Sequence, residues 1–272
     1  MNFYEKIRAI QRKNKSLLCI GLDPDLNRIP AFLSAYEYPI LEFNRRIIEA
    51  TKDFVCAYKL NMAFYESAGP HCWHIVHQTL AGIPEEIITI GDAKRGDIGN
   101  SAEMYARSIV DDYKFTACTV SPYMGGDSVK PFMKNKEQGV FVLTVTSNPG
   151  AKDLQYLKVR DRPLYEQVIR LAKKWNSNHN CGLVAGATRP AELRRVRALA
   201  PEMPLLIPGI GVQGGDVKSV VHYGCDTRGE MAIITASRSV IYASDGEDFA
   251  EAARTAAIQL RDEINTHRKE FL

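Results

Sequence analysis

The stretch Ile87-Ile88-Thr89-Ile90-Gly91-Asp92-Ala93-Lys94-Arg95-Gly96-Asp97 runs from an apolar strand directly into an Asp-x-Lys-x-x-Asp triplet. Side chains alternate between the two faces of a strand, so Asp92 and Lys94 share a face with Ile88 and Ile90, which the periodicity assigns to the interior. Charges at the end of a buried row must pair with one another or take part in chemistry. The stretch therefore predicts a charged site at the end of a core strand.

Strand-like runs and helical segments alternate along the whole chain. The runs, rich in β-branched and apolar residues, span residues 16–23, 54–61, 86–94, 116–123, 140–147, 181–188, 205–211 and 231–238. Segments of helical character span residues 39–52, 63–80, 100–112, 128–136, 163–178, 190–200, 215–222 and 247–269. Two of them have typical start signals, Asn100 followed by Glu103, and Pro190. This alternation predicts a single-domain α/β protein over residues 1–272, a parallel (β/α)8 TIM barrel, with an open doubly wound sheet as the alternative.

The composition is that of an ordinary globular protein. Hydrophobic residues make up 45% and charged residues 25% of the 272 residues, and the formal net charge is +3, which gives no support for nucleic-acid binding. No run approaches the ~18 consecutive apolar residues of a membrane helix, and the N-terminus lacks the order of a signal peptide. We therefore expect a cytoplasmic protein with neither a membrane nor a nucleic-acid partner.

Cysteines and histidines raise the question of disulfides and metals. Four of the six cysteines lie in or beside apolar runs without Cys-x-x-Cys spacing and are expected to be small core residues: Cys19, Cys56, Cys118 and Cys181. His71, His74 and His77 are three apart and could share a metal from one helix face. No carboxylate or second thiol nearby completes a ligand set, so we expect a partly exposed exterior helix and no metal.

Charged side chains also end the first two strand-like runs, at Asp23 and Lys59. Neighbouring barrel strands lie ~4.8 Å apart, so Asp23, Lys59, Asp92 and Lys94 can touch in a row of alternating sign at the C-terminal rim, where catalytic residues of barrels collect. A structural salt-bridge network is the alternative. Four charges at the rim, followed by Asp97 in the next loop, favour a functional site. Asp97 taken alone could instead interact with the dipole of the helix that follows it.

A glycine-rich turn follows the seventh strand-like run. Gly209-Ile210-Gly211-Val212-Gln213-Gly214 fits the dinucleotide pattern G-x-G-x-x-G, but that pattern belongs after the first strand of its unit, with an acid closing the next strand. Loops after strands seven and eight are the usual phosphate site of barrels, and Ser237-Arg238 follows the eighth run. We therefore expect the two loops to hold a phosphate, with the glycines admitting it and Arg238 pairing with it.

These motifs, taken together, resemble a known family. The run from Gly91 to Asn100 is similar to the active-site signature of the orotidine 5′-phosphate decarboxylase family, in its longer bacterial subgroup. Further segments resemble that subgroup in the same order: Ser121-Pro122-Tyr123-Met124-Gly125, Thr146-Ser147-Asn148-Pro149-Gly150, Gly186-Ala187-Thr188, Pro208 to Gly215, and Ala236-Ser237-Arg238-Ser239. The resemblance covers almost the whole chain.

The resemblance implies an enzyme of pyrimidine biosynthesis that converts orotidine 5′-phosphate to uridine 5′-phosphate and carbon dioxide. Loss of the carboxyl group leaves a carbanion without an electron sink, so the site must stabilise negative charge and then supply a proton. By resemblance, Lys94 donates the proton, Asp92 and Asp97 keep it charged, and Lys59 fixes the network; Asp92 also crowds the substrate carboxylate. This chemistry needs neither a metal nor an organic cofactor.

The resemblance also implies substrate contacts and a partner. The substrate-binding residues are expected to be Asp23, Ser147, Pro208, Gln213, Gly214, Ser237 and Arg238. Of these, Gln213 and Arg238 are expected to bind the phosphate and Ser147 the edge of the pyrimidine. Asp97 is expected to reach the active site of a partner subunit, which implies a homodimer with shared sites.

Three alternative functions remain open at this stage. A magnesium-dependent decarboxylase of the 3-keto-gulonate 6-phosphate type shares the Asp-x-Lys-x-x-Asp pattern, but carries an acid where Lys59 stands. A Schiff-base aldolase would use Lys59 or Lys94 as its nucleophile. A barrel that only binds a phosphate ligand would leave the charged row without a purpose. Ser121 stands where asparagine is common in the subgroup, so no role is assigned to it.

Overall fold

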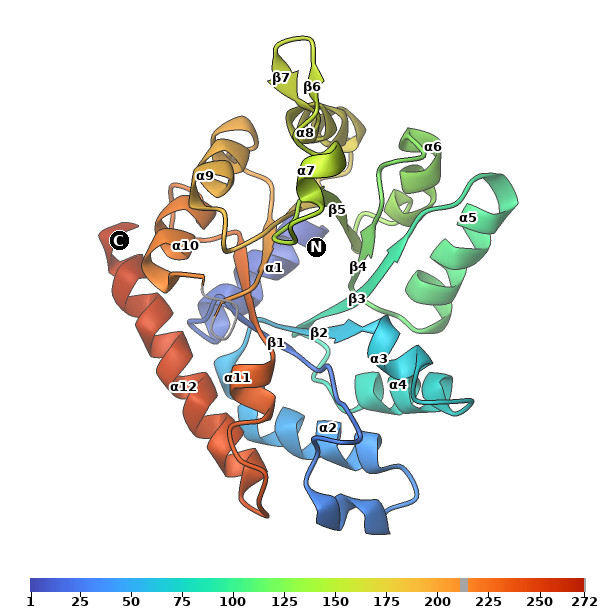
Figure 1. Ribbon diagram of the computed structural model, residues 1–272, viewed down its shortest axis with the longest axis vertical. Coiled ribbons are helices and arrows are strands. Elements are labelled where there is room, and N and C mark those ends of the chain that lie inside the picture. The colour runs from blue at the N-terminus through green and yellow to red at the C-terminus, as the bar shows by residue number, and fades with distance from the viewer. Residues whose placement is uncertain (211–214, 272) are drawn as a thin grey trace.

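The computed structural model describes residues 1–210 and 215–271, and in these residues eight parallel strands close into a barrel inside a ring of helices (Figure 1). The strands are β1 Leu18–Gly21, β2 Ala57–Asn61, β3 Ile88–Arg95, β4 Ala117–Val120, β5 Gly139–Val145, β8 Cys181–Ala185, β9 Leu205–Pro208 and β10 Ala232–Ala236. β1 pairs with both β2 and β10, so the sheet has no free edge there. The predicted TIM barrel is confirmed, and the open-sheet alternative is wrong.

The outer ring and the loops contain helices of very different lengths. The α-helices are α1 Phe3–Lys13, α2 Pro39–Thr51, α3 Met62–Glu66, α4 Cys72–Ala81, α5 Gly99–Ala106, α6 Gly126–Val129, α7 Ala151–Leu154, α8 Leu164–Trp175, α9 Pro190–Leu199, α10 Val217–Gly224, α11 Arg238–Ile241 and α12 Phe249–Arg268. A π-helical turn spans Arg107–Asp112, and 3-10 turns span Ala31–Ala35, Lys52–Phe54, Lys130–Met133 and Lys269–Phe271. A short hairpin, β6 Lys158–Val159 and β7 Arg162–Pro163, lies outside the barrel. None of the helices in the described residues is long and apolar enough to cross a membrane.

Two predicted helix boundaries are wrong. The segment 63–80 is not one helix, because Gly69 takes a backbone φ of +100° between α3 and α4, and a helix cannot continue through that conformation. Helix α5 begins at Gly99, with Ile98 as its N-cap and no side-chain capping bond, so Asn100 is not its cap. Pro190, in contrast, is the first residue of α9 as predicted.

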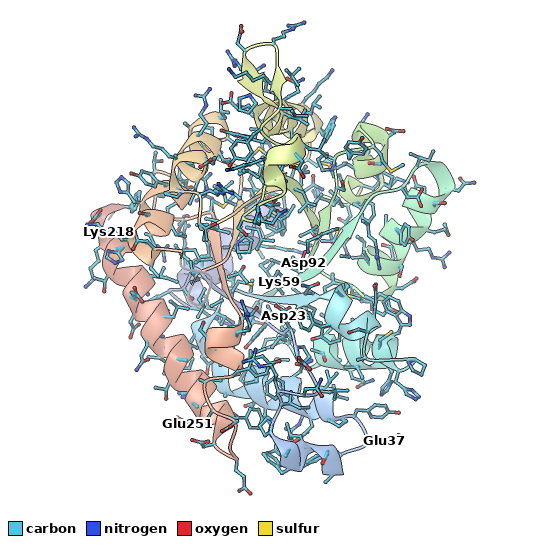
Figure 2. The ribbon with its side chains drawn as sticks, in the orientation of Figure 1. Asp23, Glu37, Lys59, Asp92, Lys218 and Glu251 are labelled. Carbon is cyan, nitrogen blue, oxygen red and sulfur yellow. The ribbon has the colours of Figure 1, made fainter. Side chains whose placement is uncertain are left out.

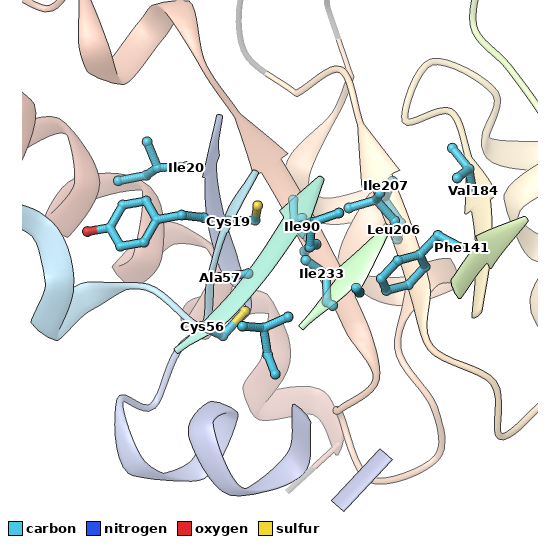
Figure 3. Close-up of a cluster of buried hydrophobic side chains, with 14 of the residues drawn as sticks. Cys19, Ile20, Cys56, Ala57, Ile90, Phe141, Val184, Leu206, Ile207 and Ile233 are labelled. Atoms are coloured by element: carbon cyan, nitrogen blue, oxygen red, sulfur yellow. The ribbon is translucent and has the colours of Figure 1, made fainter. Parts of the chain in front are cut away.

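The barrel core is filled by apolar side chains from every strand, Phe141 among them. Figure 3 shows part of this core, with Ile90, Ile207 and Ile233 converging from three strands. Burial on both faces explains why the strands are continuous apolar runs rather than alternating ones. All six cysteines are free and buried, which agrees with the interpretation of Cys19, Cys56, Cys118 and Cys181 as core residues.

Helix α1 precedes the first strand and was not part of the predicted alternation of strands and helices. It covers the N-terminal end of the barrel, where the strands begin. The Tyr4 hydroxyl donates to the carbonyl of Cys181 at 2.6 Å, and Gln11 donates to the carbonyl of Ala232 at 2.8 Å. Phe3 packs against Gly139, where an added Cβ would lie 2.1 Å from the Phe3 ring. These contacts tie α1 to the starts of β8, β10 and β5 and leave the opposite end of the barrel open.

Candidate active site

The predicted row of charges is present at the C-terminal ends of β1, β2 and β3 (Figure 2). The Lys59 ammonium lies 3.7 Å from Asp23 Oδ1 and 3.0 Å from Asp92 Oδ2. The other oxygen of Asp92, Oδ1, lies 2.7 Å from the ammonium of Lys94. The structure thus brings Asp23, Lys59, Asp92 and Lys94 together in alternating sign.

The electrostatics of the row keep Asp92 and Lys59 charged at neutral pH. Burial alone would raise the pKa of Asp92, but Lys59 and Lys94 outweigh that effect and lower it to about 2. Burial alone would lower the pKa of Lys59, but Asp23 and Asp92 outweigh it and raise that pKa above the ordinary lysine value. Both groups therefore carry their charges into any reaction near pH 7.

Lys94 has an unusual backbone. Its φ is +49°, in the left-handed region that a residue with a side chain seldom occupies. The pairing of β3 with β4 shifts at this point, from Gly91 opposite Cys118 to Arg95 opposite Val120. This bulge turns the Lys94 side chain back toward Asp92.

A cavity of about 460 Å³ opens beside the charged row. Asp23, Lys59 and Asp92 line it together with the predicted substrate-binding residues Pro208, Ser237 and Arg238. The Ser237 hydroxyl donates to Asp23 Oδ2 at 2.7 Å, so the first and last strands of the barrel are joined at the cavity wall.

Several lining residues escaped prediction from the sequence: Asn61, Phe64, Arg28, Thr235 and Tyr242. Arg28 lies over the ring of Tyr242, with 4.1 Å from its guanidinium carbon to the ring centroid. The Thr235 hydroxyl is buried and has no hydrogen-bond partner among the described residues, so it is available to a ligand. Asn61 and Thr235 lie at the ends of apolar strands, close in sequence to site residues that were predicted. Their position at a strand end could therefore have identified them from the sequence.

The turn after β9 closes tightly at the cavity. Gly209, which lines the cavity, has a φ of +106°, and its carbonyl accepts the N–H of Gly215 at 3.2 Å. Any side chain at Gly215 would crowd that carbonyl, at 2.8 Å from an added Cβ. Gln213 and Gly214, the other predicted binding residues of this turn, lie outside the described residues.

Three predicted site residues in the described part of the chain do not line the cavity: Lys94, Ser147 and Asp97. Lys94 is joined to the cavity wall through its contact with Asp92. Ser147 follows β5 and packs against Gly186, where an added Cβ would lie 3.0 Å from the Ser147 nitrogen. Asp97 lies in a separate hollow of about 500 Å³, among Trp73, Met104 and Tyr105. Its carboxylate accepts the N–H of Ile98 at 2.8 Å.

The histidines do not form a metal centre in the described part of the chain, where no group of three or more His, Cys, Asp or Glu residues is placed to hold an ion. The rings of His71 and His74 pack instead against Tyr38, with centroid distances of 5.7 and 5.0 Å. These contacts give the two histidines a packing role on the barrel exterior.

The geometry suits one kind of chemistry. An ammonium held beside a partly buried carboxylate can stabilise a developing negative charge and supply a proton to it, because both groups are fixed before a ligand enters. Arg238 is exposed at the start of α11 and lines the same cavity, where it is free to pair with a phosphate. The cavity thus combines a row of acidic and basic side chains with an exposed arginine.

Comparisons with known proteins agree on one family. A family model described as "Orotidine 5'-phosphate decarboxylase / HUMPS family" matches residues 16–253. An orotidine 5′-phosphate decarboxylase of Dehalococcoides mccartyi is 50% identical over all of both chains, and that of Herpetosiphon aurantiacus is 52% identical over 94% of this chain and 95% of its own. The solved structure of the Leishmania donovani OMP decarboxylase is similar with a TM-score of 0.87 at 39% identity, covering 98% of this chain and 99% of that one.

Gly21 leads to a prediction about the cavity wall. An alanine Cβ there would lie 1.8 Å from Ser237 Oγ, so Gly21→Ala must displace Ser237 and break its bond to Asp23. We expect the free energy of unfolding, measured with urea, to fall by about 1–3 kcal/mol. Adding Ser237→Gly should restore part of that loss, with a coupling energy of about 0.5–3 kcal/mol in the double-mutant cycle.

Gly82→Ala is the matched control, because an added Cβ there makes only ordinary contacts, at 3.5 Å or more. If the effects of Gly21→Ala and Ser237→Gly on the free energy of unfolding were strictly additive, the two residues would not crowd one another.

Proposed function

The chain belongs to the orotidine 5′-phosphate decarboxylase family and catalyses the conversion of orotidine 5′-phosphate to uridine 5′-phosphate, and we propose that Lys94 is the proton donor of this reaction. The observation that carries the proposal is the 2.7 Å contact between the Lys94 ammonium and a carboxylate, Asp92, that is ionised at neutral pH. The comparisons do not favour the magnesium-dependent decarboxylase, the aldolase or the binding barrel. We further propose that residues 1–272 act as one cytoplasmic barrel domain.

In the proposed mechanism, the bond between C6 and the carboxylate carbon breaks, and its electron pair stays on C6. The substrate carboxylate lies near Asp92, and like charges at close range disfavour the bound substrate relative to the transition state. The Lys94 ammonium stabilises the negative charge on C6 and then transfers a proton to it, which leaves neutral lysine to regain a proton from water. Lys59 keeps Asp92 and Asp23 in place throughout, since it lies between both carboxylates.

The remainder of the substrate is assigned to the other walls of the cavity. We propose that Asp23 and Ser237 contact the ribose, Pro208 the base, and Arg238 the phosphate, because all four line the cavity beside the charged row. Gln213 and Gly214 are proposed to complete the phosphate site, and Ser147 to bind the pyrimidine edge. Binding energy from the phosphate, which does not react, is then available to stabilise the transition state at the other end of the substrate.

We propose a homodimer in which Asp97 serves the partner's site. Asp97 lies outside its own cavity, in the hollow with Trp73, Met104 and Tyr105, and the side chains of these three residues and of Ile98 are exposed. An exposed cluster of large apolar and aromatic side chains is typical of a surface that another chain covers. A second copy placed there would receive Asp97 at its edge and would bury the cluster.

The first prediction from this proposal is decarboxylation without a cofactor. After exhaustive chelation, the purified protein should still convert orotidine 5′-phosphate to uridine 5′-phosphate, followed by the change in ultraviolet absorbance. Lys94→Ala should lower kcat by at least ~10³-fold, since it removes both the proton donor and the cation. Activity that is lost on chelation and restored by magnesium would contradict the proposed chemistry.

The second prediction concerns the phosphate. Arg238→Ala should lower kcat/KM for orotidine 5′-phosphate by about 10²-fold, or ~3 kcal/mol, because it removes a charge-assisted pair with the dianion. The same variant should hardly change the reaction of orotidine, which lacks the phosphate. Arg228→Ala is the control, because this exposed arginine precedes β10 at the opposite end of the barrel. An equal loss with both substrates would refute the assignment.

The third prediction concerns the shared site. Mixing the inactive variants Lys94→Ala and Asp97→Ala gives mixed dimers in which one site carries both lesions and the other carries neither. With free exchange, half of the dimers are mixed and have one intact site, so about a quarter of wild-type activity should return. Mixing Lys94→Ala with Asp92→Ala is the control and should restore nothing, since both residues belong to the same chain's site. Absence of recovery in the first mixture, despite proven exchange, would rule out the shared site.

A further inference from the structure

Thr119 is a buried residue of β4 whose hydroxyl touches two parts of the charged row. It accepts the backbone N–H of Lys94 at 2.9 Å and donates to Asp92 Oδ1 at 2.9 Å. The residue is 1% exposed, so water does not compete for either bond. Because a hydroxyl has one proton, accepting from Lys94 leaves that proton for Asp92, and the direction of both bonds is fixed.

The bulge in β3 explains why a residue at this position matters. Between the pairs Gly91 with Cys118 and Arg95 with Val120, residues 92–94 lie opposite Thr119 alone. The backbone N–H of Lys94 therefore has no carbonyl opposite it in the regular ladder and bonds to the Thr119 hydroxyl instead. A left-handed conformation is strained for a residue with a side chain, so it must be held by such contacts.

The same hydroxyl completes the surroundings of Asp92. Lys59 binds one oxygen of this carboxylate, and Lys94 and Thr119 bind the other. Three donors fix the plane of the carboxylate, and with it the direction from which it holds the Lys94 ammonium. Hydrogen bonds to the ionised form also lower a carboxylate pKa.

We infer that Thr119 is a positioning residue of the decarboxylation, which holds the Lys94 backbone in its left-handed turn and orients Asp92 toward the Lys94 ammonium. The inference rests on the proposed function, since it assigns Thr119 a part in delivering the proton of Lys94. Thr119 is not itself among the described residues that line the cavity and reaches it only through Asp92, so we expect its effect on chemistry and not on substrate affinity.

The same two strands contain a natural control. At their other ends, the Thr89 hydroxyl accepts the backbone N–H of Thr116 at 3.0 Å and contacts its hydroxyl at 3.1 Å. Thr89→Val removes a hydroxyl between β3 and β4 that makes comparable bonds, but far from the charged row. If the role of Thr119 were purely structural, Thr119→Val and Thr89→Val would lower kcat by the same factor.

The test compares Thr119→Val, Thr119→Ser and Thr89→Val. Thr119→Val keeps the shape and removes the hydroxyl, and we expect kcat to fall by about 10²-fold through misplacement of Lys94. KM for orotidine 5′-phosphate and the Kd of uridine 5′-phosphate should stay within about threefold, since ground-state contacts are kept. Thr119→Ser should recover most of kcat, and Thr89→Val should keep all of it.

In Thr119→Val the acid limb of the profile of kcat against pH should also move to higher pH, because the Asp92 carboxylate loses a hydrogen-bond donor.

Three outcomes would overturn the inference. They are a wild-type kcat in Thr119→Val, an equal loss of kcat in Thr89→Val, and a kcat in Thr119→Ser as low as in Thr119→Val. Amide hydrogen exchange over residues 92–96 tests the structural half without turnover: Thr119→Val should lose protection there and Thr119→Ser should retain it. If the wild-type protein did not decarboxylate orotidine 5′-phosphate, the proposed function would fail, whereas a normal Thr119→Val enzyme would refute this inference alone.

Discussion

One buried ammonium between two carboxylates is the constraint on which the site depends. Lys59 lies on β2, and barrel closure places β1 and β3 on either side of it, so its charge must be met from both neighbours. An isolated charge at such a depth would cost several kcal/mol, and two carboxylates without the lysine between them would repel one another. The alternation of sign therefore stabilises the folded barrel, and it is established before a substrate arrives.

The barrel was predictable from the sequence because strands buried on both faces appear as continuous apolar runs, and these alternate regularly with helical segments. The helix boundaries were less predictable. The break at Gly69 depends on a backbone conformation that glycine permits but does not require. Helix α1 precedes the first strand and stands outside the alternation, and its partners lie more than a hundred residues away in the sequence.

The charged row could be predicted because each of its members ends a core strand, and strand ends meet at one rim of a barrel. Thr119 could not, since a threonine in an apolar strand is ordinary. Its role appears only when the shifted pairing of β3 places it opposite Lys94. The hollow around Asp97 was similarly hidden, because exposed apolar residues are recognised as a cluster only in three dimensions.

The contacts of α1 have a consequence for synthesis on the ribosome. The apolar face of this helix is made before its partners Gly139, Cys181 and Ala232, which emerge much later. β1 likewise waits for β10 to complete its pairing. At about 5–20 residues per second, α1 stays without its last partner in β10 for roughly ten seconds or more. During this interval the nascent chain exposes an unpaired edge of β1 and the apolar face of α1. These are the surfaces that chaperones would need to shield from aggregation.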